Sequence, residues 1–229
     1  MTTNVAQNFW RLESPDYDHK QVSWDDGMDW ESIVCPINQG HQRAGKRITD
    51  LHIILNPQKI TDFMWTPVFS YCLISDAVFK LFKKEGLSGF EVKPVKSRVE
   101  GSNNTPPVFW ELVLTGWGGL ATHKSGIQLD RSNSCPVCGN LRYTGLCSPP
   151  DLIDLNAWDG SDFFMVWPMP RYIFTTERVI KIIRDSQISG FVATPVLNLK
   201  ETNGFSPGRL HYHMPDDRAR RLGIPLGIY

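Results

Sequence analysis

The sequence predicts an α+β fold in which two related β-α-β units pack as one pseudo-symmetric body. Three observations support this prediction. The segment 71–95 recurs at 172–196, a cysteine-proline pair precedes each copy, and both copies combine strand and helix patterns in the same order. Hydrophobic residues make up 41% of the 229 residues and charged residues 21%, which is typical of a globular chain with a sizeable core.

The two copies align without a gap at an offset of 101. Self-similarity at a fixed spacing indicates a duplicated structural unit, and two copies favour a packed pair over a solenoid. Upstream, Asp62-Phe63 aligns with Asp162-Phe163. The identical pairs are Tyr71/Tyr172, Val78/Val179, Lys80/Lys181, Ser88/Ser189, Gly89/Gly190, Phe90/Phe191, Pro94/Pro195 and Val95/Val196.

Within each copy, a strand is expected to lead into a helix. Residues 69–74 and 171–174 are apolar and aromatic, which favours strands. Ser75 is an N-cap residue type, and Thr175 or Thr176 takes this place in the second copy. Apolar side chains then recur at helical spacing and predict one buried face. They are Val78, Leu81 and Phe82 in the first copy and Val179, Ile182 and Ile183 in the second.

Further strands are expected around the helices. The run 87–95 alternates like a strand, and Pro94 suggests its end or an edge position. Strands are also predicted at 9–12 and 107–114, and a short one at 210–214, whereas the glycine-rich run 116–119 is interpreted as a turn.

The chain is interpreted as a single compact domain, 1–229, with five parts. Residues 1–34 supply an N-terminal strand and an acidic loop, and 35–95 form the first repeat. Residues 96–134 form a connecting hairpin region, 135–196 the second repeat, and 197–229 a C-terminal extension.

The cysteines predict a metal site more than a disulfide framework. Their number, five, is odd, and Cys72 lies in an apolar run that is typical of a buried thiol. Cys135-Pro-Val-Cys138-Gly139 is a knuckle that can present two sulfurs to one Zn²⁺. In the first copy Cys35 survives, but Asn38 takes the second cysteine's place.

If the two knuckles meet, Cys35, Cys135 and Cys138 supply three metal ligands. The fourth ligand is then either His41 or Cys147. A thiolate-rich site of this kind would be a structural zinc site, because it leaves no open position for water. The alternative is that the metal has been lost and the thiols remain as relics. A redox role for the knuckle is disfavoured, because turn-like segments flank it.

Charge and motifs exclude several functions. The 24 basic residues balance the 24 acidic ones, which argues against a nucleic-acid binder. The sequence lacks an apolar run of membrane-spanning length and a secretory signal pattern, so a cytoplasmic protein is expected. No hydrolase, metalloprotease or phosphate-loop motif occurs. His211 and His213, or His123, are the candidates for an enzyme, on the interpretation that 210–214 is a strand with both imidazoles on one face.

The segment 24–31 combines acidic and aromatic residues. It is expected to be either a solvated loop or a contact patch for a basic partner, since charge complementarity speeds association and aromatic side chains anchor it. The candidate partner-binding residues are Trp24, Asp25, Asp26, Asp29, Trp30 and Glu31.

The strand 9–12, the two Cys-Pro knuckles and the β-α-β segment after each together resemble the myxobacterial double-CxxCG motif family. The resemblance covers roughly 9–196, and its sharpest element is 135–139 followed by the segment that ends in Ser189-Gly190-Phe191. Members of that family include immunity proteins that protect a bacterium from a polymorphic toxin delivered by its kin. The first knuckle departs from the pattern at Asn38 and Gln39, and 197–229 extends beyond it.

The resemblance implies an antitoxin-like protein that binds and neutralises a cognate toxin, without catalysis. A second hypothesis is a zinc-stabilised adaptor or regulatory module that has no toxin partner. A third is an enzyme that uses the histidines named above. Neither the toxin nor the oligomeric state follows from the sequence.

Overall fold

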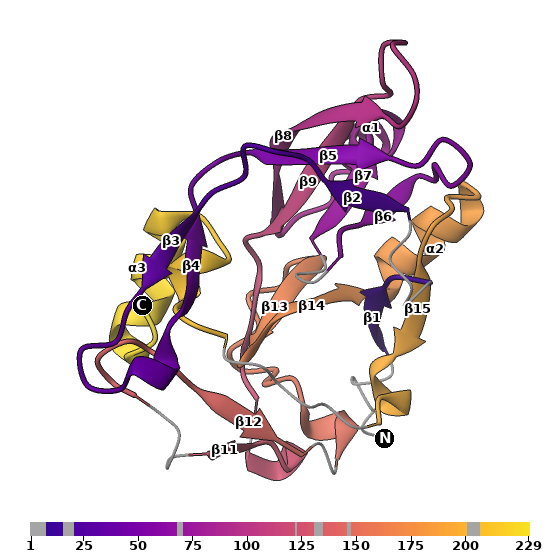
Figure 1. The fold of residues 1–229 in the computed structure, drawn as a ribbon. Coiled ribbons are helices and arrows are strands. Elements are labelled where there is room, and N and C mark those ends of the chain that lie inside the picture. Colours follow the sequence, from indigo (N-terminus) through magenta and orange to yellow (C-terminus); the bar gives the residue numbers. More distant parts are fainter. Residues whose placement is uncertain are drawn as a thin grey trace, which may run out of the picture.

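Two large β-sheets and three α-helices build the described part of the protein, so the α+β class is confirmed (Figure 1). The computed structural model describes residues 8–15, 21–67, 71–121, 123–130, 135–145, 148–200 and 207–229. The six-stranded sheet lies at the top of Figure 1 and the five-stranded sheet below it. Two small hairpins project to the left of and below these sheets.

The five-stranded sheet joins the N-terminal strand to the second copy of the repeat. Its order is β10 (Trp117–Leu120), β13 (Phe163–Trp167), β14 (Met169–Thr176), β1 (Phe9–Glu13) and β15 (Val192–Pro195). β1 lies antiparallel to both β14 and β15. The predicted strand at 9–12 is therefore confirmed, and it is a central strand of this sheet.

The six-stranded sheet contains the first copy of the repeat. Its order is β2 (Val22–Trp24), β5 (Leu51–Leu55), β8 (Phe90–Val99), β9 (Phe109–Leu114), β7 (Cys72–Ser75) and β6 (Phe63–Trp65). β8 pairs with β9 at one end and with β5 at the other. Pro94 is the last β8 residue opposite β9, and pairing with β5 starts at Val95, so this proline occupies an edge-like part of the strand.

Both repeat helices form where the sequence predicts them. In α1 (Asp76–Lys84), the Ser75 hydroxyl accepts a hydrogen bond from the Val78 backbone N–H at 3.3 Å. In α2 (Glu177–Asp185), Thr176 is the N-cap residue but its side chain makes no capping hydrogen bond. Its hydroxyl instead donates to Asp162 at 3.2 Å.

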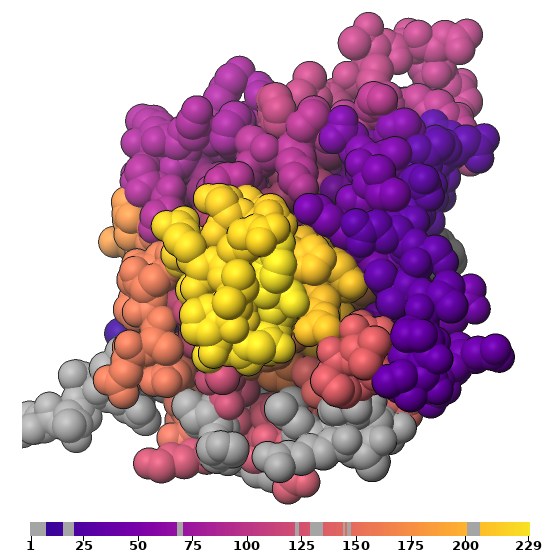
Figure 2. Space-filling view, turned by 90° about the vertical axis from the view of Figure 1, so that its left-hand side faces the viewer, coloured from indigo at the N-terminus to yellow at the C-terminus, as the bar shows by residue number. Residues whose placement is uncertain are grey.

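The C-terminal extension differs from the prediction. Residues 210–214 do not form a strand, because Leu210–Tyr212 is a 3₁₀ turn (η7) that leads into α3 (Asp216–Leu226). Ala219 of α3 is fully buried. Figure 2 shows this segment in yellow, seated in the middle of one face of the molecule.

Two further predictions were wrong in part. The run 116–119 is not a turn, since Trp117–Leu120 forms strand β10 beside β13. Residues 24–31 are not all loop, because Trp24 ends β2 and Trp30–Ile33 forms β3. β3 pairs with β4 (Arg43–Arg47), and a second small hairpin joins β11 (Gln128–Asp130) to β12 (Arg142–Thr144).

The main hydrophobic core belongs to both sheets and to the C-terminal segment. It combines Phe63 and Phe82 from the first copy with Phe163 from the second, together with Leu210 and Ala219. The rings of Phe82 and Phe163 lie 5.2 Å apart, which is within the range of favourable aromatic pairs. This core therefore spans the seam between the segments 71–95 and 172–196 and the residues that precede them.

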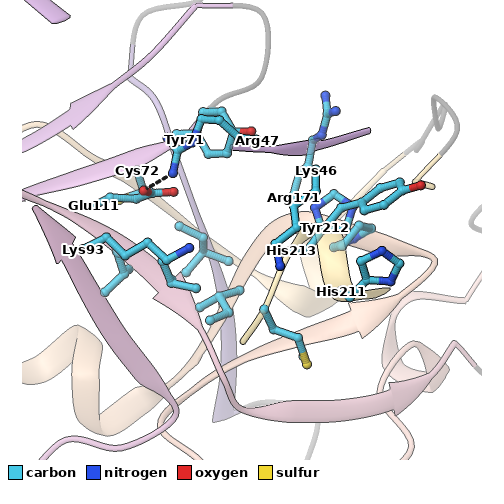
Figure 3. A pocket seen from close by; sticks show the side chains of 16 residues that line it. Lys46, Arg47, Tyr71, Cys72, Lys93, Glu111, Arg171, His211, Tyr212 and His213 are labelled. Atoms are coloured by element: carbon cyan, nitrogen blue, oxygen red, sulfur yellow. Dashed lines mark hydrogen bonds and ion pairs between the residues drawn. The ribbon is translucent and has the colours of Figure 1, made fainter. Parts of the chain in front are cut away.

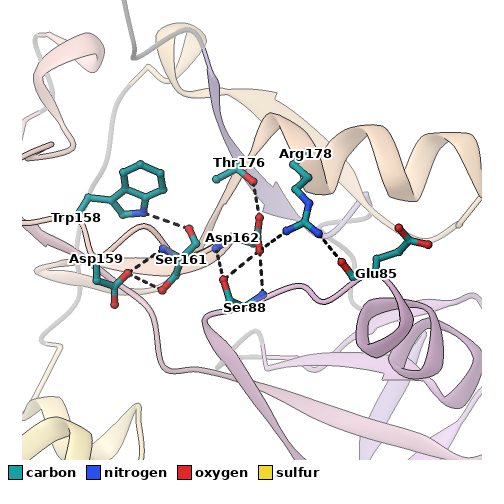
Figure 4. Close-up of polar contacts among 8 residues, drawn as sticks. All are labelled: Glu85, Ser88, Trp158, Asp159, Ser161, Asp162, Thr176 and Arg178. Carbon is teal, nitrogen blue, oxygen red and sulfur yellow. Dashed lines mark hydrogen bonds and ion pairs between the residues drawn. The ribbon is translucent and has the colours of Figure 1, made fainter.

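At this seam each Ser-Gly-Phe segment contacts the Asp-Phe segment of the other copy. Figure 4 shows one of these contacts, that of Ser88 with Asp162. The backbone N–H and the hydroxyl of Ser88 both donate to Asp162, each at 3.0 Å. Ser189 donates in the same two ways to Asp62, at 3.0 and 2.7 Å. We call these two arrangements the seam clasps.

The glycines of the Ser-Gly-Phe segments allow this close approach. Gly89 has a φ of +85°, and a Cβ placed on it would lie 1.9 Å from the Phe163 carbonyl oxygen. Gly190 has a φ of +89°, and its Cβ would lie 2.2 Å from the Phe63 oxygen. Any larger residue would push the two backbones apart, in addition to the cost of positive φ.

The two seam clasps are expected to differ in strength. Asp162 also accepts from Thr176 and forms an ion pair with Arg178 at 3.1 Å, and its side chain is only 10% exposed. We expect Asp162→Asn to lower the free energy of unfolding by about 2–4 kcal/mol, because the donors from Ser88, Thr176 and Arg178 lose a nearly buried charged acceptor. Asp62→Asn should cost about 1–2 kcal/mol, because Asp62 has no ion pair among the described residues. Urea denaturation of both variants measures the difference, and an equal loss would contradict the interpretation.

Candidate metal centre

The two small hairpins bring the predicted metal ligands together. Cys35 follows β3, and His41 ends a 3₁₀ turn, η2 (Gln39–His41), that leads into β4. Cys135 and Cys138 lie between β11 and β12. Each hairpin therefore carries two ligand candidates in its connecting loop.

The four ligand atoms of Cys35, His41, Cys135 and Cys138 all lie within 4.8 Å of one another. The sulfurs of Cys35 and Cys135 are 3.7 Å apart, and the Cys138 sulfur lies 3.7 Å from His41 Nδ1. Bonds of ~2.3 Å to a tetrahedral zinc ion would place sulfurs ~3.8 Å apart. A disulfide needs an S–S distance of ~2.05 Å. These distances fit a shared metal ion and not a disulfide.

The second knuckle is closed by its own backbone. The Cys135 N–H donates to the Asn140 carbonyl and the Gly139 N–H donates to the Cys135 carbonyl, both at 2.8 Å. The backbone N–H of Cys138, with smaller help from the His41 ring, lowers the pKa of Cys135 to about 6. Burial raises the pKa of Cys138. Backbone N–H groups that face the Cys135 sulfur favour the thiolate, which is the form that binds metal.

Asn38 has a different role from the cysteine expected at its place. Its side-chain oxygen accepts from the Gly40 N–H at 2.9 Å and so caps η2. Its amide nitrogen lies 3.4 Å from His41 Nε2, while Nδ1 of the same ring faces Cys138. Asn38 therefore positions the turn that delivers His41 in place of a fourth thiol.

Two arginines hold the second knuckle from outside. Arg43 of β4 donates to the Cys138 carbonyl and, at 3.0 Å, to the Asn140 side chain. Arg209 donates to the Pro136 carbonyl at 2.8 Å. A Cβ on Gly139 would lie 2.6 Å from Arg209 Nε, so the glycine of this knuckle leaves room for the arginine.

This arrangement suits a structural metal and not a reacting one. Cys35, Cys135 and Cys138 are 2%, 7% and 7% exposed, and with His41 they supply four donors. Three thiolates and one imidazole fill a tetrahedral site and leave no position for water or substrate. Three thiolates around a divalent ion leave one net negative charge, which Arg43 and Arg209 lie close enough to balance.

The structure brings together four of the five predicted ligands. Cys147 lies outside the described residues, so only His41 stands as the fourth ligand among them. Cys72 is buried in β7 away from this cluster, and burial raises its pKa, as expected for an inert core thiol. Sequence reasoning missed Arg43 and Arg209, because nothing in their spacing links them to the knuckle.

The histidines of the C-terminal segment do not lie on a strand. His213 is half-buried, and its Nε2 contacts the Pro207 carbonyl at 2.5 Å. Burial lowers the pKa of His213 to about 4, so it is neutral at pH 7. His211 packs against the rings of Tyr212 and Tyr229 at 4.7 and 4.8 Å. The side chain of His123 lies outside the described part of the chain.

In the acidic-aromatic segment, the tryptophan rings and the acidic side chains differ in how far they are buried. Trp24 and Trp30 are half-buried and pack edge to face, and Trp24 also packs against Tyr71. Arg98 pairs with Asp25 through two hydrogen bonds of 2.8 and 3.0 Å. The members left on the surface are the acidic side chains of Asp26, Asp29 and Glu31.

Comparisons with family models and with curated proteins identify no relative of this chain. Neither a family model nor a curated protein matches the chain. Among the helices of the described residues, none has the length and apolar character needed to cross a membrane. The functional argument therefore depends on the chain's own geometry and chemistry.

From the geometry of the metal centre we expect one metal ion per chain. Protein purified without added metal is expected to hold about one ion per chain, measured by plasma mass spectrometry. Cys135→Ser should release the ion and lower Tm, because metal binding stabilises the folded state. Cys72→Ala is the matched control, since it removes a buried thiol outside the cluster and should keep the ion. Full metal content in Cys135→Ser would overturn the assignment.

His41 is expected to bind the metal ion directly and not only to lie beside the three cysteines. His41→Cys supplies a fourth thiolate at the same place and should retain the metal, whereas His41→Ala should lose it to a chelator about 10–100-fold more readily. Competition with a chromophoric chelator measures the difference. If His41→Ala holds metal as tightly as the unaltered protein, the fourth ligand lies elsewhere.

Proposed function

We propose that the protein is an immunity protein, which binds and neutralises a cognate polymorphic bacterial toxin in the cytoplasm and performs no catalysis. The observation that carries this proposal is the meeting of the two hairpin loops at one cluster of three cysteines and a histidine. Paired knuckles are what the resemblance to the double-CxxCG family implies. A closed, thiolate-rich centre stabilises a fold but offers no reacting position.

We further propose that the centre holds zinc and that its role is structural. The donor set of Cys35, Cys135, Cys138 and His41 is typical of structural zinc sites. One ion would join two hairpins about 100 residues apart in the chain, as the numbering of Cys35 and Cys135 shows. A surface that binds a partner is better preserved when such distant segments are fixed to each other.

The proposal includes a gene duplication, and the strand arrangement supports it. The neighbours β6-β7-β9-β8 in one sheet correspond to β13-β14-β1-β15 in the other. In this correspondence Trp110 of β9 takes the place of Trp10 of β1. The indole N–H of Trp110 donates to Asp76 of α1, and that of Trp10 donates to Glu177 of α2.

The duplicated unit would then be longer than the segments 35–95 and 135–196 suggest. Phe9-Trp10 and Phe109-Trp110 share the offset of 100, so the unit extends from residue 9 to about residue 99 and from 109 to about 199. Each unit would give its first strand to the sheet of the other. A pair of units joined in this way cannot separate without breaking both sheets.

We propose the exposed carboxylates at Asp26, Asp29 and Glu31 as the part of the acidic-aromatic segment that meets the toxin. Asp25 already has Arg98 as its ion-pair partner, and Trp24 packs against Tyr71. Exposed carboxylates steer a basic partner to this face and set the rate of association. The half-buried tryptophans would support the patch from beneath.

The second candidate is a zinc-stabilised adaptor or regulatory module without a toxin partner. The apolar side chains exposed around the metal centre favour it. Val34, Ile37 and Val137 are 63%, 70% and 50% exposed, and all three lie beside metal-ligand candidates. Exposed apolar side chains that are gathered at one place suit protein contact.

The immunity proposal predicts a toxin gene beside this chain's gene, and binding of the purified protein to the product of such a gene tests it. The purified protein is expected to bind that product and to abolish its toxicity when both are expressed together. The double variant Asp26→Lys/Asp29→Lys should slow association about tenfold at low salt. Asp185→Lys, an exposed reversal at the end of α2, is the control and should leave the rate unchanged. Absence of binding would remove the immunity proposal, and binding without protection would favour an adaptor.

A further inference from the structure

Figure 3 shows a cavity that both halves of the chain and the C-terminal extension line. Two of its lining residues also contact the acidic-aromatic segment: Tyr71 packs against Trp24, and the Lys46 backbone N–H donates to Glu31 at 3.4 Å. Its volume is about 90 Å³, whereas a single water needs ~10–15 Å³ on the same measure. β4, β7, β8, β9, β14 and the segment 211–214 all contribute to its lining. The cavity therefore has room for a small molecule, and both halves of the chain and the C-terminal extension enclose it.

The charge of this cavity is unbalanced in a chain that is balanced as a whole. Lys46, Arg47, Lys93 and Arg171 line it, and Glu111 is the only carboxylate among its described lining residues. Figure 3 shows Lys93 on one side of the cavity and Lys46 and Arg171 on the opposite side. The lining thus carries a surplus of three positive charges, although the chain has 24 basic and 24 acidic residues.

The carboxylate of Glu111 is already engaged. Arg47 forms an ion pair with Glu111, and the side chains of both are nearly buried, at 7% and 6% exposed. The guanidinium of Arg47 also stacks over the Tyr71 ring at 4.8 Å. Its Nε and Nη1 are buried and have no hydrogen-bond partner in the described part of the chain. Both atoms are fully buried, so Arg47 adds positive charge to the lining but these two atoms are not contact points for a ligand.

The lysines remain available for a ligand. Neither Lys46 nor Lys93 forms an ion pair with any described residue. Between them the lining is apolar, with Leu112, Leu114 and Ile173. A few charged groups around an apolar lining are the usual composition of a small-molecule site.

We propose that this cavity is a binding site for a small dianion, a molecule that carries a phosphate group or two carboxylates. Two negative charges match the two lysines, which form no ion pair with a described residue, whereas a monoanion would leave one of them uncompensated. The cavity's small size and the chain's zero net charge do not suit a nucleic acid strand, which needs an extended basic surface. The proposal depends on neither zinc nor the toxin.

Isothermal titration calorimetry of the whole protein tests the proposal with three probes: inorganic phosphate, succinate and acetate. Phosphate or succinate is expected to bind with about one site per chain and more weakly as salt rises, because added ions screen the attraction. The stronger of these two probes identifies the kind of dianion. Acetate should bind at least about tenfold more weakly than the stronger probe. If neither dianion binds at millimolar concentration, or if acetate binds as well as they do, the proposal is overturned.

Two matched variants test whether the dianion binds in this cavity. Lys93→Gln should weaken binding of the better probe about tenfold, the change expected when one charge-assisted hydrogen bond is lost. Lys96→Gln removes the same charge from the same strand outside the cavity lining and should leave the affinity unchanged. Both lysines are exposed, so both variants should fold, and an unchanged Tm without ligand checks this. Equal effects of the two substitutions would show general charge attraction and would overturn the assignment to the cavity.

Discussion

The close contact of backbone with backbone at the seam is the constraint on which the rest of the structure depends. Each Ser-Gly-Phe segment lies so near the opposite Asp-Phe segment that only glycine fits at Gly89 and Gly190. The carboxylates of Asp62 and Asp162 accept from the serine donors at this contact. Because the clasps fix the two sheets, the aromatic core, the hairpins and the cavity all acquire their positions from the seam.

The metal centre gathers four donors although the first knuckle carries one cysteine and the second carries two. Asn38 supplies no thiol, but it caps the short turn that carries His41 to the cluster. The second knuckle is closed by its own backbone, and arginines from two distant segments hold its carbonyls. The cluster thus has four donors at metal-binding distances.

Local chemistry made much of this fold predictable. The apolar stripe predicted both helices and Ser75 predicted the start of the first, since these signals lie within a few residues of each other. The offset of 100 between Cys35 and Cys135 also indicated which residues would share a metal ion if the two knuckles met, and the structure brings them together. These predictions succeeded because they needed only a local pattern or a comparison of the chain with itself.

The errors arose where distant contacts override local pattern. α3 contains Gly223 and Pro225, which weaken a helical signal, and its stability comes from burial of Ala219 in the shared core. The glycines at 116–119 suggest a turn, but they allow β10 to lie against Phe164 and Val166 of β13. Arg43 and Arg209 approach the knuckle from distant parts of the chain, so no spacing in the sequence could reveal them.

The position of β1 has a consequence for synthesis of the chain on the ribosome. β1 ends at Glu13, but its only described partners are β14 and β15, which begin at Met169 and Val192. At ~5–20 residues per second, the first strand waits about 10–30 s before an edge exists for it to join. During that time an apolar, aromatic segment stays unpaired and open to chaperones or to neighbouring chains. The five-stranded sheet can therefore be completed only after β15 has been synthesised, whatever the speed of the individual folding steps.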